Sequence, residues 1–197
     1  MLSKLQHSLG ASFGSSAEGL ASDGALASDG ALAQQDYPPV EQWNPPFCGE
    51  IPLKIDATGQ WWYDGSLITR PALVRLFARV LKREGDEYFL VTPVEKVQIN
   101  VLDVPLLVVS WERQANGSIV VHTSTDDHTL ISLEHPLQMR FNESAKCAIP
   151  YIMIRNNLWA KVQQNVYYQL AAELAIDAGH AWLQSGDYRA DFGAIAQ

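Results

Sequence analysis

Apolar and polar residues alternate over many short stretches of the chain, and this spacing of two predicts β-strands. Turn-forming residues such as Asp64-Gly65 and Asn156-Asn157 separate these stretches. The strands are expected at 51–55, 60–63, 88–92, 94–101, 106–112, 119–123, 128–133, 137–141, 151–155 and 158–162. Most of the folded part of the chain is therefore expected to be sheet.

Two further stretches carry apolar residues three and four positions apart, which is the spacing of an amphipathic helix. The first stretch begins at Thr69, a suitable N-cap residue, and ends at Gly85, a typical glycine at a helix C-terminus. The second stretch runs from Gln163 to about Ser185, where Gly186 would end it. The sequence thus predicts two long helices, one near the middle of the chain and one near its C-terminus.

The order of these elements is two strands, a helix, many strands and a helix. Because strands and helices do not alternate regularly, we do not expect a parallel dinucleotide-binding fold. We expect the α+β class with mostly antiparallel sheet. We divide the chain into an N-terminal subdomain (40–102) and a C-terminal subdomain (103–186). Both are small enough to be marginal as independent folds, so we expect two interlocked subdomains that share apolar surface.

The two ends of the chain differ from this pattern. Residues 1–39 are rich in glycine, alanine and serine, and they contain the hexad ASDGAL twice in tandem. Such a composition buries little apolar surface, so we interpret 1–39 as a low-complexity segment that is disordered or lies on a neighbouring surface. Residues 187–197 form a short tail.

Charge and cysteine content limit the partners and the compartment. The net charge of −8 argues against general binding to nucleic acid or to an anionic membrane, although a local basic pocket for one small anion is compatible with it. Two scattered cysteines and the lack of a long apolar run or of a secretory signal favour the cytoplasm. We therefore expect a cytoplasmic protein that binds neither nucleic acid nor membrane.

No segment carries a recognisable catalytic or phosphate-loop motif, so we predict no catalytic residue and no cofactor. The histidines of the strand region (His122, His128 and His135) do not fall on one face by alternation, and no cysteine pair lies near them. Because a zinc site needs several ligands that converge, we predict no metal site. Ordinary surface histidines are the favoured interpretation.

Cations at the ends of elements are the better candidates for chemistry. Arg70, Lys96 and Arg155 each lie at or beside an element end, and arginine binds phosphate and carboxylate through two parallel hydrogen bonds. The alternative is that each cation pairs with a nearby acid. Trp62 lies on the opposite side of its strand from Trp61 and Tyr63, so one of the two sides can stack on a ligand base or pack against a neighbouring sheet.

A larger set of residues resembles a known family. The matching segments are Cys48-Gly49-Glu50-Ile51, Trp62-Tyr63-Asp64-Gly65-Ser66, Leu73-Val74-Arg75-Leu76-Phe77 and, most specifically, the string REGDEYFLVTPVEKV at 83–97. Through these segments the chain from about Trp43 to Leu170 resembles the bacterial family known as domain of unknown function 1285. The resemblance implies two similar structural units, the second like a pleckstrin-homology barrel. Our own element order is compatible with this, because the predicted C-terminal helix would close such a barrel. It also implies a ligand site between the units and a signalling role.

We therefore predict a cytoplasmic protein that binds an anionic small molecule of the nucleotide type and has a regulatory or signalling role. The expected ligand contacts are Arg70, Lys96 and Arg155 as charge partners, with Trp62 or Tyr151 as a stacking face. The alternative function is a protein–protein interaction module without a small ligand. Enzyme activity ranks third, because no activated nucleophile or metal site is apparent in the sequence.

Overall fold

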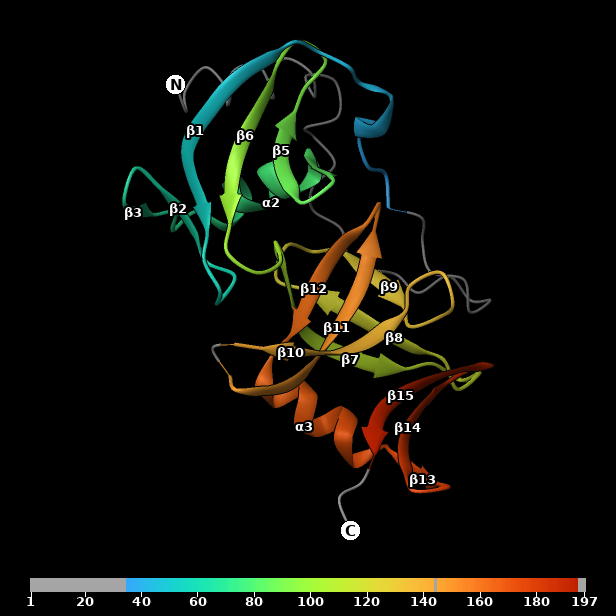
Figure 1. Cartoon of the computed structure of the whole chain (residues 1–197). Helices are drawn as coiled ribbons and strands as arrows, with labels where there is room; N and C mark the ends of the chain where they lie inside the picture. Colours follow the sequence, from blue (N-terminus) through green and yellow to red (C-terminus); the bar gives the residue numbers. More distant parts are fainter. Residues whose placement is uncertain (1–34, 144, 195–197) are drawn as a thin grey trace. The chain divides into compact units, whose positions relative to one another are not determined.

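The structure is a computed structural model that describes residues 35–143 and 145–194 (Figure 1). The chain divides into two compact units. The first unit ends at Val101 and lacks Ile55–Gly59, which belongs to the second unit together with the chain from Leu102 onward. No helix in the described part of the chain is long and apolar enough to span a membrane.

The first unit is a six-stranded sheet with one α-helix. Its strands are β1 (Phe47–Ile55), β2 (Trp61–Tyr63), β3 (Ser66–Leu67), β4 (Leu81–Glu84), β5 (Glu87–Val91) and β6 (Lys96–Val101). They lie in the order β3-β2-β1-β6-β5-β4. The helix α2 (Pro71–Arg79) follows β3, and a short 3-10 helix, η1 (Val40–Gln42), precedes β1.

The second unit contains a six-stranded sheet, one α-helix and a three-stranded sheet. The larger sheet comprises β7 (Leu106–Arg113), β8 (Ile119–Thr123), β9 (His128–Leu130), β10 (Leu137–Asn142), β11 (Cys147–Arg155) and β12 (Leu158–Val162). The helix α3 (Gln164–Ala172) follows, and then the smaller sheet of β13 (Ala175–Asp177), β14 (His180–Ser185) and β15 (Tyr188–Ala194).

The two six-stranded sheets repeat one topology. The second sheet has the order β10-β11-β12-β7-β8-β9, which, read from its other edge and numbered from its own first strand, is again 3-2-1-6-5-4. In the second unit the first and last strands of this motif, β7 and β12, pair in parallel, whereas its other pairs are antiparallel. In the first unit the corresponding strands β1 and β6 also point in the same direction (Figure 1). The helix is what differs: α2 is inserted between the third and fourth strands, whereas α3 follows the sixth.

Strand alternation positions the core of the first unit. Ile51, Leu53 and Ile55 of β1 are buried, whereas the intervening Pro52 and Lys54 are exposed. Phe77 of α2 is fully buried and stacks on Trp61, with ring centroids 6.3 Å apart. One face of the sheet therefore packs on the helix and the other face carries the outward side chains of β1.

The predicted first helix is too long. The helix ends at Arg79, and residues 81–84 form β4 instead. Leu81 pairs with Leu90 and Glu84 with Glu87, so Gly85 and Asp86 form the two-residue turn of a hairpin rather than a helix terminus. A two-residue turn that contains glycine favours a hairpin, and strand pairing with β5 outweighs the helical spacing of the preceding residues.

The predicted C-terminal helix is wrong beyond Ala172. Residues 175–194 form β13, β14 and β15, connected by the two-residue turns Ala178-Gly179 and Gly186-Asp187. Both residues of the first turn have positive φ, 51° and 79°, as in a type I′ hairpin turn. The alanine-rich sequence before this turn has a high helix propensity, but tertiary pairing overrides it. The expected closure of a barrel by one long C-terminal helix is therefore not found, and residues 188–194 of the expected tail at 187–197 form β15.

The remaining sequence predictions compare well with the structure. The predicted strands at 119–123 and 158–162 match β8 and β12, and the α+β architecture in two parts is confirmed. Cys147–Arg155 forms a longer strand than the predicted 151–155. The low-complexity interpretation of 1–39 falls mostly on residues 1–34, which lie outside the described residues.

Candidate functional site

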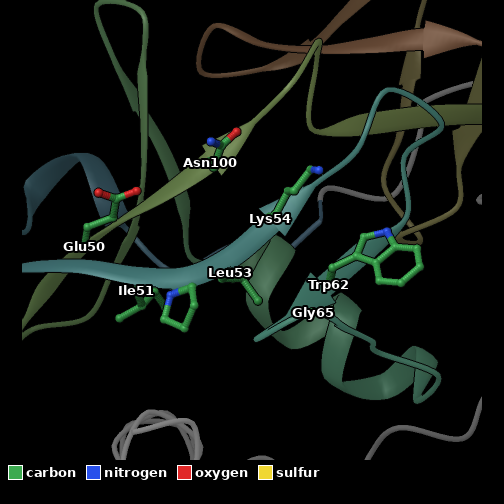
Figure 2. A pocket seen from close by; sticks show the side chains of 8 residues that line it. Glu50, Ile51, Leu53, Lys54, Trp62, Gly65 and Asn100 are labelled. Atoms are coloured by element: carbon green, nitrogen blue, oxygen red, sulfur yellow. The ribbon is translucent and has the colours of Figure 1, made fainter.

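A pocket of about 330 Å³ lies on the first unit, around the outward face of β1 (Figure 2). Alternation along β1 turns Glu50, Pro52 and Lys54 away from the buried face, toward solvent. The neighbouring strands contribute Trp62 from β2 and Asn100 from β6. The described residues that line it are Glu50, Ile51, Pro52, Leu53, Lys54, Trp62, Gly65 and Asn100.

The polar groups of this pocket are spread along one strand. Figure 2 shows the side chains of Lys54, Asn100 and Glu50 one after another across the sheet, with the Trp62 ring near the Lys54 end. Glu50 and Lys54 are four residues apart on β1, so their Cα atoms are about 13 Å apart. The pocket thus has a cationic end beside an aromatic ring and an anionic end beyond Asn100.

Lys54 differs from most other cations of the protein. Within residues 35–143 and 145–194, Lys54 and Arg70 are the cations whose side chains have no ion-pair or hydrogen-bond partner. Of these two, only Lys54 lines the pocket. An ammonium group without a protein partner retains its full capacity to bind an anion.

The predicted contacts of the first unit are separated by the fold. Trp62 is half-buried and lines the pocket. Arg70 is exposed and is the N-cap residue of α2, outside the pocket lining. Lys96 opens β6, and its Nζ atom lies 2.9 Å from Glu84 Oε2 and 4.7 Å from the centre of the Phe89 ring. This hydrogen bond from Lys96 is the main cause of the lowered pKa of Glu84.

The other two predicted contacts, Arg155 and Tyr151, belong to the second unit and are buried. The Arg155 Nε atom donates a hydrogen bond to Asp127 Oδ1 over 2.8 Å. The Tyr151 hydroxyl donates to the carboxylate of Asp103 over 3.0 Å and accepts from Asn142 Nδ2 over 2.7 Å. Burial is the main cause of the raised pKa of Tyr151, which is about 12. Both side chains are thus engaged within their own unit.

The histidines are closer together than alternation suggested. His122 and His128 are direct partners across β8 and β9, with ring centroids 6.0 Å apart, and His122 Nε2 lies 3.8 Å from Glu112 Oε1. For His122 and His128 the expectation that they do not come together was wrong, because the short turn between β8 and β9 aligns them, whereas His135 lies near the Met153 carbonyl oxygen instead. Even so, no group of three metal-ligating side chains suited to a metal ion occurs among the described residues.

Lys54, Asn100 and Glu50 were not among the residues predicted from the sequence. The alternation of apolar and polar residues at 50–55 could have indicated two of them, because it assigns Glu50 and Lys54 to the polar face of a strand. The neighbouring strand that supplies Asn100 depends on long-range pairing, which the sequence does not reveal.

Comparisons with known proteins agree with the two-part division of the chain. The family model described as "Domain of unknown function (DUF1285), N-terminal domain" matches residues 38–104. The model described as "Protein of unknown function (DUF1285), C-terminal domain" matches residues 105–188. No curated protein matches the chain.

Two solved structures are similar. A DUF1285 family protein from Silicibacter pomeroyi DSS-3 is 35% identical, with a TM-score of 0.77, over 89% of this chain and 97% of that chain. A DUF1285 family protein from Shewanella baltica OS155 is 36% identical, with a TM-score of 0.49, over 60% of this chain and 89% of that chain.

Proposed function

The chain belongs to the DUF1285 family, and we propose that it binds an anionic small molecule with a planar ring, of the nucleotide type, in a regulatory or signalling role. We assign the ligand to the pocket on the outward face of β1. The observation that carries the proposal is the unpaired Lys54 ammonium beside the Trp62 ring in one pocket. Cation and ring together match the two chemical parts of such a ligand.

Each part of the pocket supports a separate contact. The Lys54 ammonium would form a charge-assisted hydrogen bond to a phosphate or carboxylate oxygen. The half-buried Trp62 would stack on the planar ring, a contact that tolerates different bases because each has a π-face. Asn100 can both donate and accept hydrogen bonds with a sugar or a ring edge.

Size and lining favour binding of one small molecule over catalysis. A volume of about 330 Å³ lies near the lower end of the range of ligand pockets, which begins at about 300 Å³. Among the described residues, the lining contains no serine, threonine, cysteine or histidine, which commonly act as nucleophiles or general bases. Its ionisable side chains in that part of the chain, Glu50 and Lys54, come from Cα atoms about 13 Å apart, which does not favour joint acid–base action on one bond. We therefore propose recognition as the function of this pocket.

The first experiment is a thermal-shift screen of the full chain against nucleotides and related anions. A ligand at a hundred times its Kd should stabilise the protein by about 2.7 kcal/mol. The best ligand is then titrated by calorimetry into the wild type, Lys54→Met and Trp62→Leu. Losing the charge-assisted contact costs about 1.5–3 kcal/mol, so Lys54→Met should weaken binding by tenfold to a hundredfold or more. Loss of stacking in Trp62→Leu should cost about 1–3 kcal/mol.

Arg70→Ala is the matched control, because Arg70 is also a cation without a side-chain partner but does not line the pocket. It should bind like the wild type. Equal affinity of Lys54→Met and wild type, with Arg70→Ala impaired, would instead move the site to the start of α2. The proposal fails if no nucleotide or related anion binds the wild type.

A second candidate function is protein–protein interaction through the second unit. Large apolar side chains are strongly exposed there, including Tyr168 of α3 at 61% and Ile176 of β13 at 73%. Exposed apolar residues of this size can contribute to a partner surface. The expected likeness of the second unit to a pleckstrin-homology barrel is part of this second hypothesis, in which the barrel and helix faces bind a partner protein. Substituting Tyr168→Ser and Ile176→Ser should abolish any complex found by affinity capture, while leaving calorimetric ligand titrations unchanged.

A further inference from the structure

The proposed anion pocket also contains a carboxylate, Glu50, on the same exposed face of β1 as Lys54. No ion-pair or hydrogen-bond partner is assigned to the Glu50 side chain among the described residues, so its charge is not neutralised by a neighbouring cation of the protein. A carboxylate in this position opposes the binding of anions. Its effect depends on how far along the pocket the charge of a ligand extends.

The separation of Lys54 and Glu50 along β1 determines how strongly Glu50 repels ligands of different charge. A ligand with one anionic group can place this group at Lys54 while its ring rests on Trp62, which keeps its charge about 13 Å, measured between Cα atoms, from Glu50. A chain of several phosphates that begins at Lys54 and follows the pocket past Asn100 brings further negative charges toward Glu50. Glu50 repels these additional charges, whereas Lys54 is the one cation among the described lining residues that attracts them.

We infer that Glu50 is a specificity-determining residue, which makes the pocket selective for ligands with one anionic group, such as a nucleoside monophosphate, over polyphosphates. This inference rests on the proposed function of the same pocket and adds the class of ligand. In water, two unit charges about 10 Å apart change an affinity by about twofold. Two additional phosphate charges should therefore cost about fourfold in affinity through Glu50.

The test is calorimetric titration with a nucleoside 5′-monophosphate and the matching 5′-triphosphate, both without added metal ions. The proteins are the wild type, Glu50→Gln and the control Asp86→Asn. Asp86→Asn changes the net charge equally, but Asp86 lies in the turn between β4 and β5, outside the pocket lining, with a fully exposed side chain. Titrations at about 0.01 M and about 0.5 M salt separate long-range charge repulsion from contact effects, because the higher salt concentration screens the long-range repulsion.

At low salt, Glu50→Gln should raise the affinity for the triphosphate about fourfold more than that for the monophosphate, and Asp86→Asn should leave this ratio unchanged. The gain should disappear at high salt. An unchanged ratio in Glu50→Gln, with Lys54→Met still impaired, would overturn the role of Glu50 and leave the proposed function standing. Absence of binding by either nucleotide to every protein would overturn both.

Discussion

Arg155 and Asp127 form a buried ion pair in the second unit, in which Arg155 Nε lies 2.8 Å from Asp127 Oδ1. The two residues are 8% and 2% exposed. The second carboxylate oxygen of Asp127 accepts hydrogen bonds from the hydroxyl groups of Thr125, at 2.6 Å, and Thr123, at 3.1 Å. This network joins the end of β11 to the turn between β8 and β9.

Removing the carboxylate should destabilise the protein strongly. Asp127→Asn leaves the Arg155 guanidinium buried without its counter-charge, and breaking a buried pair in this way typically costs about 3–5 kcal/mol. Chemical denaturation should therefore give a free energy of unfolding lower by about 3 kcal/mol or more. The exposed neighbour supplies the control, since Asp126→Asn makes the same chemical change without loss of a buried pair.

A double variant tests whether the cost is that of an uncompensated charge. Asp127→Leu combined with Arg155→Met replaces the pair by apolar groups, which often recovers most of the lost stability. The double variant should be more stable than Asp127→Leu alone. Additive losses from the two single substitutions would mean that the two side chains are not energetically coupled, and would contradict the view that the orphaned guanidinium causes the cost.

Stability at alkaline pH should depend on Tyr151. Burial raises the pKa of its hydroxyl from 10.0 to about 12, so between these values the folded protein holds a proton that the unfolded chain has lost. The contribution of Tyr151 to stability is therefore complete below pH 10 and is lost as the pH rises through about 12. Two pH units correspond to about 2–3 kcal/mol.

Tyr151→Phe isolates this contribution from the other groups that titrate above pH 10. The free energies of unfolding of wild type and Tyr151→Phe should differ at pH 8 and converge toward pH 12. Ultraviolet absorbance of the phenolate gives an independent titration, in which one tyrosine should ionise late in the wild type. A pH-independent difference between the two proteins would mean that Tyr151 titrates equally in the folded and unfolded states.

Strand alternation and turn chemistry explain why much of the sheet could be predicted. At β8 and β12 the alternation of apolar and polar residues, bounded by turn residues, is sufficient to predict both ends of the strand. The errors at 81–84 and 175–194 have one cause, because helical spacing and propensity are local, whereas β4, β14 and β15 are stabilised by pairing with other strands. The two-residue turns at Gly85-Asp86 and Gly186-Asp187 were the local sign of a hairpin.

The candidate site could be predicted only in part. Trp62 was recognised because its strand separates it from Trp61, whereas Lys54 was passed over in favour of cations at element ends. Arg155 and Lys96 illustrate why a cation at an element end is ambiguous: both have carboxylate partners that are distant in sequence. Which cation keeps an unpaired charge is a property of tertiary contacts, and no spacing in the sequence encodes it.

The attachment of the small C-terminal sheet should depend on Ser185. This buried residue of β14 accepts a hydrogen bond from the backbone N–H of Ile119 over 2.9 Å, and its hydroxyl donates to the carbonyl oxygen of Ile131 over 2.7 Å. Ser185→Ala leaves both backbone groups without this partner in a buried environment. An unsatisfied buried group costs about 1–3 kcal/mol, so the free energy of unfolding should fall by about that amount or more.

Hydrogen exchange locates the effect of this substitution. The amide of Ile119 should exchange faster in Ser185→Ala than in the wild type, together with amides of β14 and β15, because the hydroxyl joins the smaller sheet to β8 and to the segment after β9. Ser124→Ala is the matched control, since Ser124 is exposed in the turn after β8. Equal exchange of the Ile119 amide in all three proteins would show that water replaces the Ser185 hydroxyl and that this contact does not hold the C-terminal sheet in place.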